Sequence, residues 1–138
     1  MYLIDTVVLS ELRKRERNPG VVHWISGQRT GDLFLSVISI GEIERGIAQQ
    51  HRQNPDFATA LATWLDTLMS LYGERVLPVD LPTARRWGRL SAAIGNDGAD
   101  LLIAATALEH GLTVVTRYTR HFQPADVPVI NPFVPARQ

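Results

Sequence analysis

Residues 99–107 read Ala-Asp-Leu-Leu-Ile-Ala-Ala-Thr-Ala, a carboxylate followed directly by an apolar run. The run predicts a buried helix from Asp100 to His110 that ends at Gly111, since glycine commonly follows the last turn of a helix. Residues 113–116 then form a short run rich in valine, which is typical of a strand buried on both faces. This stretch therefore predicts a helix that leads into a buried strand, with an acidic residue where the helix begins.

Four similar apolar runs lie elsewhere in the chain, at residues 2–4, 33–37, 75–79 and 127–130. Asn18-Pro19 and Asn54-Pro55 each place a helix N-cap before a proline, and Gly27 and Gly73 stand where those two helices would end. In the second of these helices the apolar residues recur with the period of one buried face: Phe57, Leu61, Trp64, Leu65, Leu68 and Leu71. Strands that alternate with helices need crossover connections, so we expect an α/β fold with three α/β/α layers and a mostly parallel central sheet.

The composition fits one globular domain and excludes several kinds of site. The chain has 138 residues, 45% of them hydrophobic, and no cysteine, which rules out disulfides, thiolate zinc sites and cysteine nucleophiles. The formal net charge is zero, so there is no global basic field to attract nucleic acid. All the basic residues except Lys14 are arginines, whose side chains make bidentate contacts to phosphate. Without a signal peptide or a membrane-spanning stretch, we expect a cytoplasmic protein that does not bind membranes.

Three carboxylates stand at junctions between predicted strands and helices. Asp5 follows the first strand, Glu42 lies in the first turn of the helix after the second strand, and Asp100 begins the helix described above. In a parallel sheet the strand ends and the starts of the following helices share one edge, where α/β folds bind ligands. We therefore expect the three carboxylates to meet at that edge.

Each carboxylate also has a purely structural interpretation. Ser39 and Glu42 have the spacing of a capping box. Asp5 can cap the helix that begins near Thr6, and Asp100 suits a helix N-terminus through the helix dipole. Carboxylates that lie close together in apolar surroundings nevertheless repel one another unless a cation binds between them. Oxygen ligands without cysteine or paired histidine select Mg²⁺ or Mn²⁺, ions that activate water and neutralise phosphate charge in phosphodiester cleavage.

Four stretches of the chain form a recognisable set. They are Tyr-Leu-Ile-Asp-Thr-Val-Val-Leu-Ser-Glu-Leu at 2–12, Phe-Leu-Ser-Val-Ile-Ser-Ile-Gly-Glu-Ile at 34–43, the stretch at 99–107 quoted above, and Leu-Thr-Val-Val-Thr-Arg at 112–117. In order and spacing they resemble the PIN-domain family, in particular the VapC and FitB type of toxin from bacterial toxin-antitoxin pairs. The resemblance extends over nearly the whole chain.

This resemblance implies one PIN-like domain over residues 1–138 that acts as a Mg²⁺-dependent endoribonuclease. Asp5, Glu42 and Asp100 match the acids that hold the ion and act in catalysis. The resemblance also implies an RNA substrate such as tRNA or ribosomal RNA, a small antitoxin protein as partner, and a homodimer. Six neighbouring residues are candidates for supporting the acids or contacting RNA: Thr6, Ser36, Thr116, Arg117, Tyr118 and His121.

Three positions depart from the family pattern. Val7 stands where members commonly have asparagine, and Tyr118 and His121 stand where they commonly have polar or acidic residues. A tyrosine hydroxyl stays protonated at neutral pH and is a poor metal ligand, which leaves open whether one or two ions bind. His121 is either a weak ligand or phosphate contact, or a filler at the surface or in the core. We predict Glu11 and Glu44 to be solvated charges.

Two other classes of function compete with the nuclease. A phosphoacceptor receiver domain has a similar length and an acidic edge, but it needs a lysine after a late strand, and Lys14 is the only lysine. The second alternative is a PIN fold that binds RNA or an antitoxin without cleaving, because the fourth acid is missing. A binding module has little reason to keep three repulsive acids, so the sequence favours the nuclease.

Overall fold

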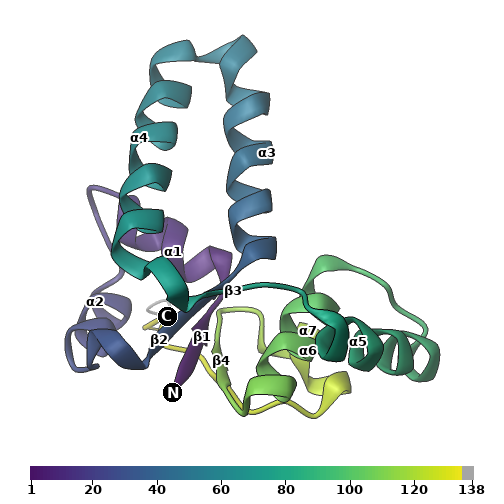
Figure 1. Ribbon diagram of the computed structural model, residues 1–138. Helices are drawn as coiled ribbons and strands as arrows, with labels where there is room; N and C mark the ends of the chain where they lie inside the picture. Colours follow the sequence, from purple (N-terminus) through teal and green to yellow (C-terminus); the bar gives the residue numbers. More distant parts are fainter. Residues whose placement is uncertain (135–138) are drawn as a thin grey trace.

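A computed structural model describes residues 1–134 of the protein (Figure 1). One parallel β-sheet forms its centre. Its strands are β1 (Tyr2–Ile4), β2 (Leu33–Ser36), β3 (Val76–Leu77), β4 (Thr113–Val115) and β5 (Val129–Ile130). They lie in the order β3-β2-β1-β4-β5, and every paired strand runs parallel to its neighbour. The predicted α/β fold with a mostly parallel sheet is confirmed.

Helices cover both faces of this sheet. One face carries α1 (Thr6–Arg13), α2 (Pro19–Ser26), α3 (Val37–Gln53) and α4 (Pro55–Tyr72); the other carries α5 (Leu81–Ile94), α6 (Ala99–His110) and the short α7 (Thr119–Phe122). The 3-10 helices η1 (Thr30–Asp32), η2 (Gly73–Arg75) and η3 (Gln123–Ala125) fill connections. Helices α3 and α4 form a hairpin that projects beyond the sheet, and Figure 1 shows α5, α6 and α7 on the other side of the strands.

The buried residues form two clusters, one on each face of the sheet. Ile4 of β1 belongs to the cluster under α1 to α4, whereas Leu3 belongs to the cluster under α5 to α7, and neither is accessible to solvent. Both faces of the central strand are therefore apolar, which explains why its sequence does not alternate. Trp24 and Trp64 pack against the first cluster and Trp87 against the second. Within residues 1–134, no helix is both long enough and apolar enough to span a bilayer.

The boundary between β2 and α3 differs from the prediction. The strand ends at Ser36, whose side chain accepts a hydrogen bond from the Ile38 amide at 3.0 Å and caps α3, so Val37 is already helical. The predicted capping box of Ser39 and Glu42 is therefore wrong, because both residues lie inside the helix. Glu42 lies in the second turn of α3 rather than the first.

Other boundaries shift for similar reasons. Strand β3 is shorter than the apolar run at 75–79, since Arg75 belongs to the 3-10 helix η2 and the strand ends at Leu77. Strand β5 is shorter than the run at 127–130, since pairing with β4 begins only at Val129. The helices after Asn18 and Asn54 begin and end as predicted. Leu71, predicted on the buried face of α4, is 63% exposed because it lies in the last turn of that helix.

The order of the strands makes β1 a turning point of the topology. From β1 the chain builds β2 and then β3 on one side, and α5 and α6 then carry it across to β4 and β5 on the other side. The carboxyl ends of β1 and β4 are thus neighbours at the point where the strand order reverses, the usual ligand site of open α/β sheets.

Candidate active site

Asp5 follows the last residue of β1 and is buried at this turning point, with 4% of its surface exposed. It is the N-cap of α1, and its Oδ1 accepts a hydrogen bond from the Thr6 amide at 2.8 Å. Its Oδ2 accepts a hydrogen bond from the Thr116 hydroxyl at 2.7 Å. Asp5 therefore does cap a helix, as its structural interpretation requires, but a residue from beyond β4 also fixes its second oxygen.

The electrostatic surroundings of Asp5 oppose its ionisation. Burial raises the pKa of Asp5 to about 6, against the lowering effect of the hydrogen bonds from Thr116 and Thr6. The negative charges of Asp100 and Glu42 raise this pKa further. The three predicted carboxylates thus act on one another electrostatically, and a cation placed among them would relieve both the burial cost and the repulsion.

Glu42 reaches the same edge from α3 through a pair of hydroxyls. Thr6 Oγ1 lies 2.8 Å from both Ser39 Oγ and Glu42 Oε1. A hydroxyl donates only one hydrogen and an ionised carboxylate only accepts, so the Thr6 hydroxyl donates to Glu42 and accepts from Ser39. The start of α1 thereby fixes the orientation of Glu42. Arg45, one turn further along α3, lies 4.0 Å from the other oxygen of Glu42.

Asp100 lies in the first turn of α6, and Gly98 is the N-cap of that helix. The exposed amides of a helix N-terminus favour a negative charge there. The Oδ2 atom of Asp100 lies 2.7 Å from Nδ1 of His121, a residue of α7. The His121 ring stacks on Tyr118, with ring centroids 5.2 Å apart and planes 16° from parallel.

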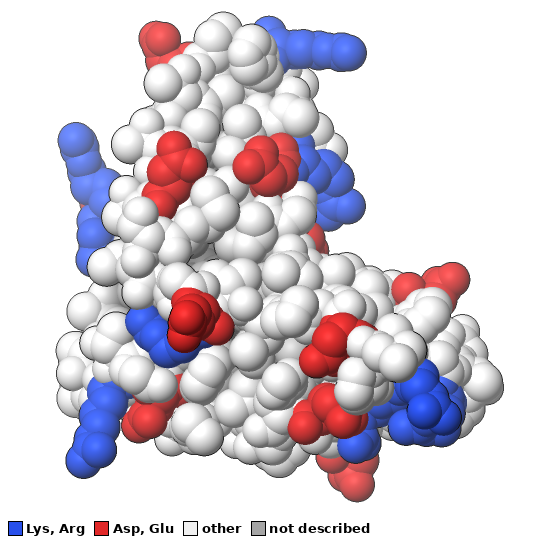
Figure 2. All heavy atoms as spheres, in the orientation of Figure 1, with Lys and Arg blue, Asp and Glu red and all other residues white. Residues whose placement is uncertain are grey.

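A hollow of about 510 Å³ joins these elements, at the corner between the base of the α3–α4 hairpin and the start of α6. Its lining mixes charged, polar and apolar surface and comes from α3, α6, α7 and the loops around them: Glu42, Asn96, Gly98, Ala99, Asp100, Arg120, His121 and Pro124. Figure 2 shows that acidic and basic groups are interspersed over this view of the molecule. Any polyanion would therefore be held by local contacts at the corner and not by a uniformly basic face.

The donor set fits a hard divalent cation. Carboxylate and hydroxyl oxygens surround the carboxyl end of β1, and the chain has no cysteine that would favour a softer ion. Among residues 1–134, no three carboxylate or imidazole groups come close enough together to enclose an ion on their own. Mg²⁺ does not require such a cage, since it usually keeps several waters and takes only one or two carboxylates with substrate phosphate.

Several of the remaining sequence predictions concern residues that the structure places elsewhere. Ser36 is buried and caps α3, with no hydrogen bond to a carboxylate. Arg117 lies over the Phe133 ring, 4.6 Å from its centroid, rather than in the hollow. Val7 packs against the first core cluster.

The prediction that Glu11 is a solvated charge is wrong. Glu11 is 7% exposed, and its carboxylate accepts hydrogen bonds from the Asn18 amide at 2.9 Å and from Lys14 Nζ at 3.0 Å. The Asn18 amide and then Lys14 lower the pKa of Glu11. A contact with the following loop, which helical periodicity does not report, buries this side chain.

Two residues that the sequence analysis did not select take part in the site. Ser39 supports Thr6 and Glu42, and Arg120 lines the hollow. Ser39 precedes Glu42 by three residues on one face of α3, so the helical spacing that suggested a capping box could also have suggested a shared site. Arg120 had no signal of its own, because the helix that presents it has four residues.

The parallel sheet, its order and the carboxylates at its turning point define the class of protein. The model of the PIN domain family matches residues 2–126, and the chain belongs to this family. VapC ribonuclease Y4jK of Sinorhizobium fredii is 38% identical over 99% of this chain and 100% of its own length. Toxin FitB of Neisseria gonorrhoeae is 36% identical over 96% of this chain and 99% of its own length. The crystal structure of FitAcB from Neisseria gonorrhoeae aligns with a TM-score of 0.85 at 36% identity, covering 96% of this chain and 98% of that chain.

Proposed function

We propose that this protein is a Mg²⁺- or Mn²⁺-dependent endoribonuclease and the toxin of a toxin-antitoxin pair. The observation that carries the proposal is the convergence of Asp5, Glu42 and Asp100 from three distant elements on one edge of the sheet, where burial and repulsion raise the pKa of Asp5. Membership of the PIN domain family and the resemblance to VapC ribonuclease and toxin FitB support the same conclusion.

We assign different roles to the three carboxylates at this edge of the sheet. Asp5 and Asp100 would hold the ion, and Glu42 faces the same hollow from α3. When bound, the ion supplies a water of lowered pKa and neutralises charge on the phosphate under attack. Thr116 and Thr6 keep the Asp5 and Glu42 oxygens in fixed directions, so the donors are in place before the ion and the RNA arrive. Arg120, on the wall of the hollow, is placed to bind a phosphate next to the cleaved bond.

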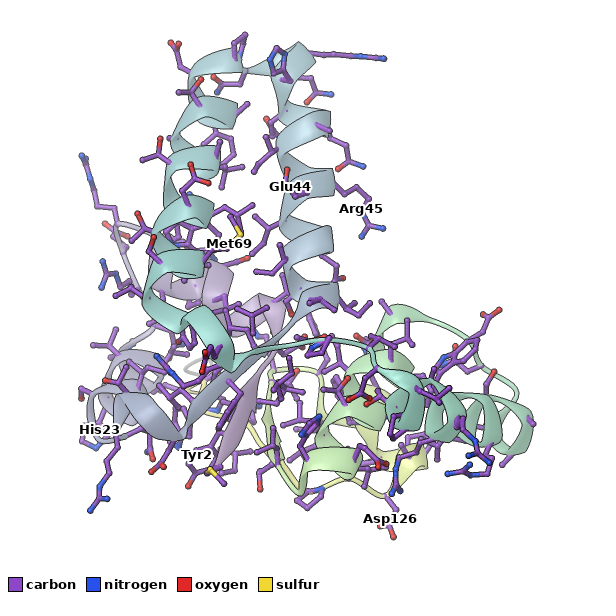
Figure 3. The ribbon with its side chains drawn as sticks, viewed as in Figure 1. Tyr2, His23, Glu44, Arg45, Met69 and Asp126 are labelled. Atoms are coloured by element: carbon purple, nitrogen blue, oxygen red, sulfur yellow. The ribbon has the colours of Figure 1, made fainter. Side chains whose placement is uncertain are left out.

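The cleavage assay uses purified chain, freed of any bound partner, with total tRNA or ribosomal RNA. Reactions contain Mg²⁺, Mn²⁺ or EDTA, and Asp5→Asn and Asp100→Asn are compared with the wild type. Asp126→Asn is the matched control, because Asp126 does not line the hollow, its side chain projects outward from the protein (Figure 3), and its positive φ is one that asparagine tolerates. We expect discrete fragments that need the metal and the two acids but not Asp126. Wild-type cleavage by Asp100→Asn would refute the role given to Asp100.

The competing function is a PIN fold that binds RNA or an antitoxin without cleaving. The contact between His121 and Asp100 favours this alternative, because it occupies one oxygen of a carboxylate that the ion would need. The same assay separates the two functions. A folded protein that binds RNA but yields no fragments with either metal would establish the binding function.

The proposed toxin function also implies a protein partner and an oligomeric state. A small antitoxin protein would hold the toxin inactive, and two copies of the chain would form a homodimer. Light scattering of the isolated chain, and of the chain with a co-expressed antitoxin, measures both masses directly. A monomer at all concentrations would contradict the homodimer.

A further inference from the structure

Tyr118 and His121 form a stacked aromatic pair, and His121 lines the hollow. Their ring centroids are 5.2 Å apart and their planes differ by 16°, the geometry of an offset stack. Tyr118 precedes α7 and His121 lies within it, so the two rings come from one short segment.

The pair is exposed but firmly held. Tyr118 is 47% exposed, and the His121 side chain is 54% exposed. Beneath them, Phe122 is fully buried in the second core cluster, and the Tyr118 amide donates to Thr116 Oγ1 at 3.0 Å. His121 is fixed in turn by its contact with Asp100. Since one face of the Tyr118 ring lies on His121, the exposed surface of Tyr118 belongs to the parts of the side chain that His121 does not cover.

The surroundings of the pair match the chemistry of a nucleotide. His121 and Arg120 line the same hollow as Asp100 and Glu42, and no carboxylate of residues 1–134 forms an ion pair with Arg120. A flat π surface next to a free guanidinium suits a nucleobase whose flanking phosphate meets the arginine. Every base has a π face, so such a surface accepts many sequences but requires that the base be unpaired.

We propose that Tyr118, backed by His121, is a stacking platform for one unpaired base of a single-stranded RNA next to the cleaved bond. This inference rests on the proposed nuclease function and gives Tyr118 a role in positioning its RNA substrate. In a duplex both faces of each base are covered by its neighbours, so a duplex offers the platform nothing to bind.

The test measures binding in EDTA, where no metal-dependent cleavage occurs. The probe is a fluorescein-labelled oligouridylate titrated with the purified full chain and followed by fluorescence anisotropy. We expect Tyr118→Ala and Tyr118→Leu to weaken binding about tenfold, the usual effect of losing one base-aromatic stack. Tyr118→Phe keeps the π face and should bind as the wild type does. Leu81→Ala, at an exposed apolar side chain on α5, is the control for loss of surface hydrophobicity and should change nothing.

A second readout reports stacking directly. A single 2-aminopurine within the oligouridylate should lose fluorescence when it stacks on Tyr118, and Tyr118→Leu should abolish that loss. Equal affinity of Tyr118→Ala and wild type, absence of binding by the wild type, or equal binding of the annealed duplex would each overturn the platform. The nuclease proposal is judged separately, by the metal-dependent fragments and the effect of Asp5→Asn.

Discussion

The Thr116 hydroxyl donates a 2.7 Å hydrogen bond to Oδ2 of Asp5 and so joins the ends of two neighbouring strands, β4 and the central strand β1. Thr116 is fully buried and Asp5 nearly so. In this environment the hydrogen bond lowers the pKa of Asp5 and opposes the effect of burial. Thr116 therefore helps to keep the carboxylate ionised and holds it in one direction, although it does not itself face the hollow.

Replacing Thr116 by valine should impair cleavage without unfolding the protein. Valine fills nearly the same volume but donates no hydrogen bond, so the pKa of Asp5 should rise and its orientation should loosen. We expect cleavage to fall by about 10- to 100-fold, as is typical when a group that orients a metal ligand is removed. Thr116→Ser should restore most of the rate. Initial rates at saturating Mg²⁺ across the pH range provide the measurement, and unchanged rates in Thr116→Val would contradict this role.

Asp5→Asn should stabilise the metal-free protein at neutral pH. Asp5 has a pKa of about 6 in the folded state against an ordinary 3.8, so the folded state binds the proton more tightly than the unfolded state does. The free energy of unfolding therefore falls as the pH rises from about 4 to about 6, and the loss is complete above pH 6. Removing the charge should recover up to about 3 kcal/mol at pH 7.5, a limit set by the size of the pKa shift.

Urea unfolding in EDTA at several pH values measures this effect. We expect the wild type to lose stability between pH 4 and pH 6 relative to Asp5→Asn, while Asp126→Asn follows the wild type. A lower stability of Asp5→Asn at pH 7.5 would mean that the hydrogen bonds from Thr6 and Thr116 to the charged oxygens outweigh the burial cost.

The positions of the acids could be predicted from sequence because they depend on local signals. Asp5 follows a strand and Asp100 begins a helix, and the parallel arrangement of the sheet brings such junctions together. Whether Ser36 or Ser39 caps α3 could not be predicted, because either serine can satisfy a helix N-terminus and the end of β2 decides between them. Residues 135–138 of the predicted domain lie outside the described part of the chain.

The contact between His121 and Asp100 could not be predicted from the sequence. Helix α7 has four residues, fewer than the spacing of a buried face needs to become visible. It exists because Phe122 is buried in the core and draws the segment against α6. Burial of Glu11 likewise depends on the path of the loop that ends at Asn18. Both features depend on tertiary structure, so periodicity and capping signals cannot report them.

Asn18 should contribute more to stability than an ordinary helix cap. Its Oδ1 accepts hydrogen bonds from the Gly20 and Val21 amides at the start of α2 and from the Val134 amide near the end of the described chain. Asn18→Ala should cost about 2 kcal/mol, the upper end for loss of a cap, because a second segment is released as well. Asn54→Ala is the matched comparison, since Asn54 caps α4 through the Phe57 amide alone, and it should cost about 1 kcal/mol. Urea denaturation compares the two, and equal losses would show that the Val134 contact contributes nothing.

Mg²⁺ should stabilise the wild type and not the acid variants. An ion that binds only the folded state adds about 1.4 kcal/mol to the free energy of unfolding at ten times its dissociation constant. The melting temperature of the wild type should therefore rise with Mg²⁺, whereas Asp5→Asn and Asp100→Asn should show no rise. Asp126→Asn should respond as the wild type does. A rise of equal size in all four proteins would place the ion elsewhere.

If the protein binds RNA as proposed, the outer side of α3 offers the strand a path away from the carboxylates. A shallow hollow of about 390 Å³ runs along this helix above Glu42, lined by Arg45, Ala48, Gln49, Arg52 and Gln53. Arg45 extends away from α4, on the side of the hairpin that faces the corner (Figure 3). This lining contains two guanidinium groups and no carboxylate, so it is suited to the phosphates of a strand that leaves the corner.

If those phosphates bind there, the salt dependence of RNA binding should report it. Each phosphate contact contributes about 0.7 to the slope of log affinity against log salt concentration for a single strand. We expect Arg45→Gln and Arg52→Gln each to lower the slope by about that amount and to weaken binding of all sequences alike. Arg15→Gln should leave the slope unchanged, because Arg15 belongs to the connection between α1 and α2, which lies on the other side of the hairpin from α5 and α6 (Figure 1). Anisotropy titrations of the labelled oligouridylate in EDTA at several salt concentrations give the slopes. If the two α3 variants keep the wild-type slope while the Tyr118 variants lose affinity, the strand leaves the corner by another route.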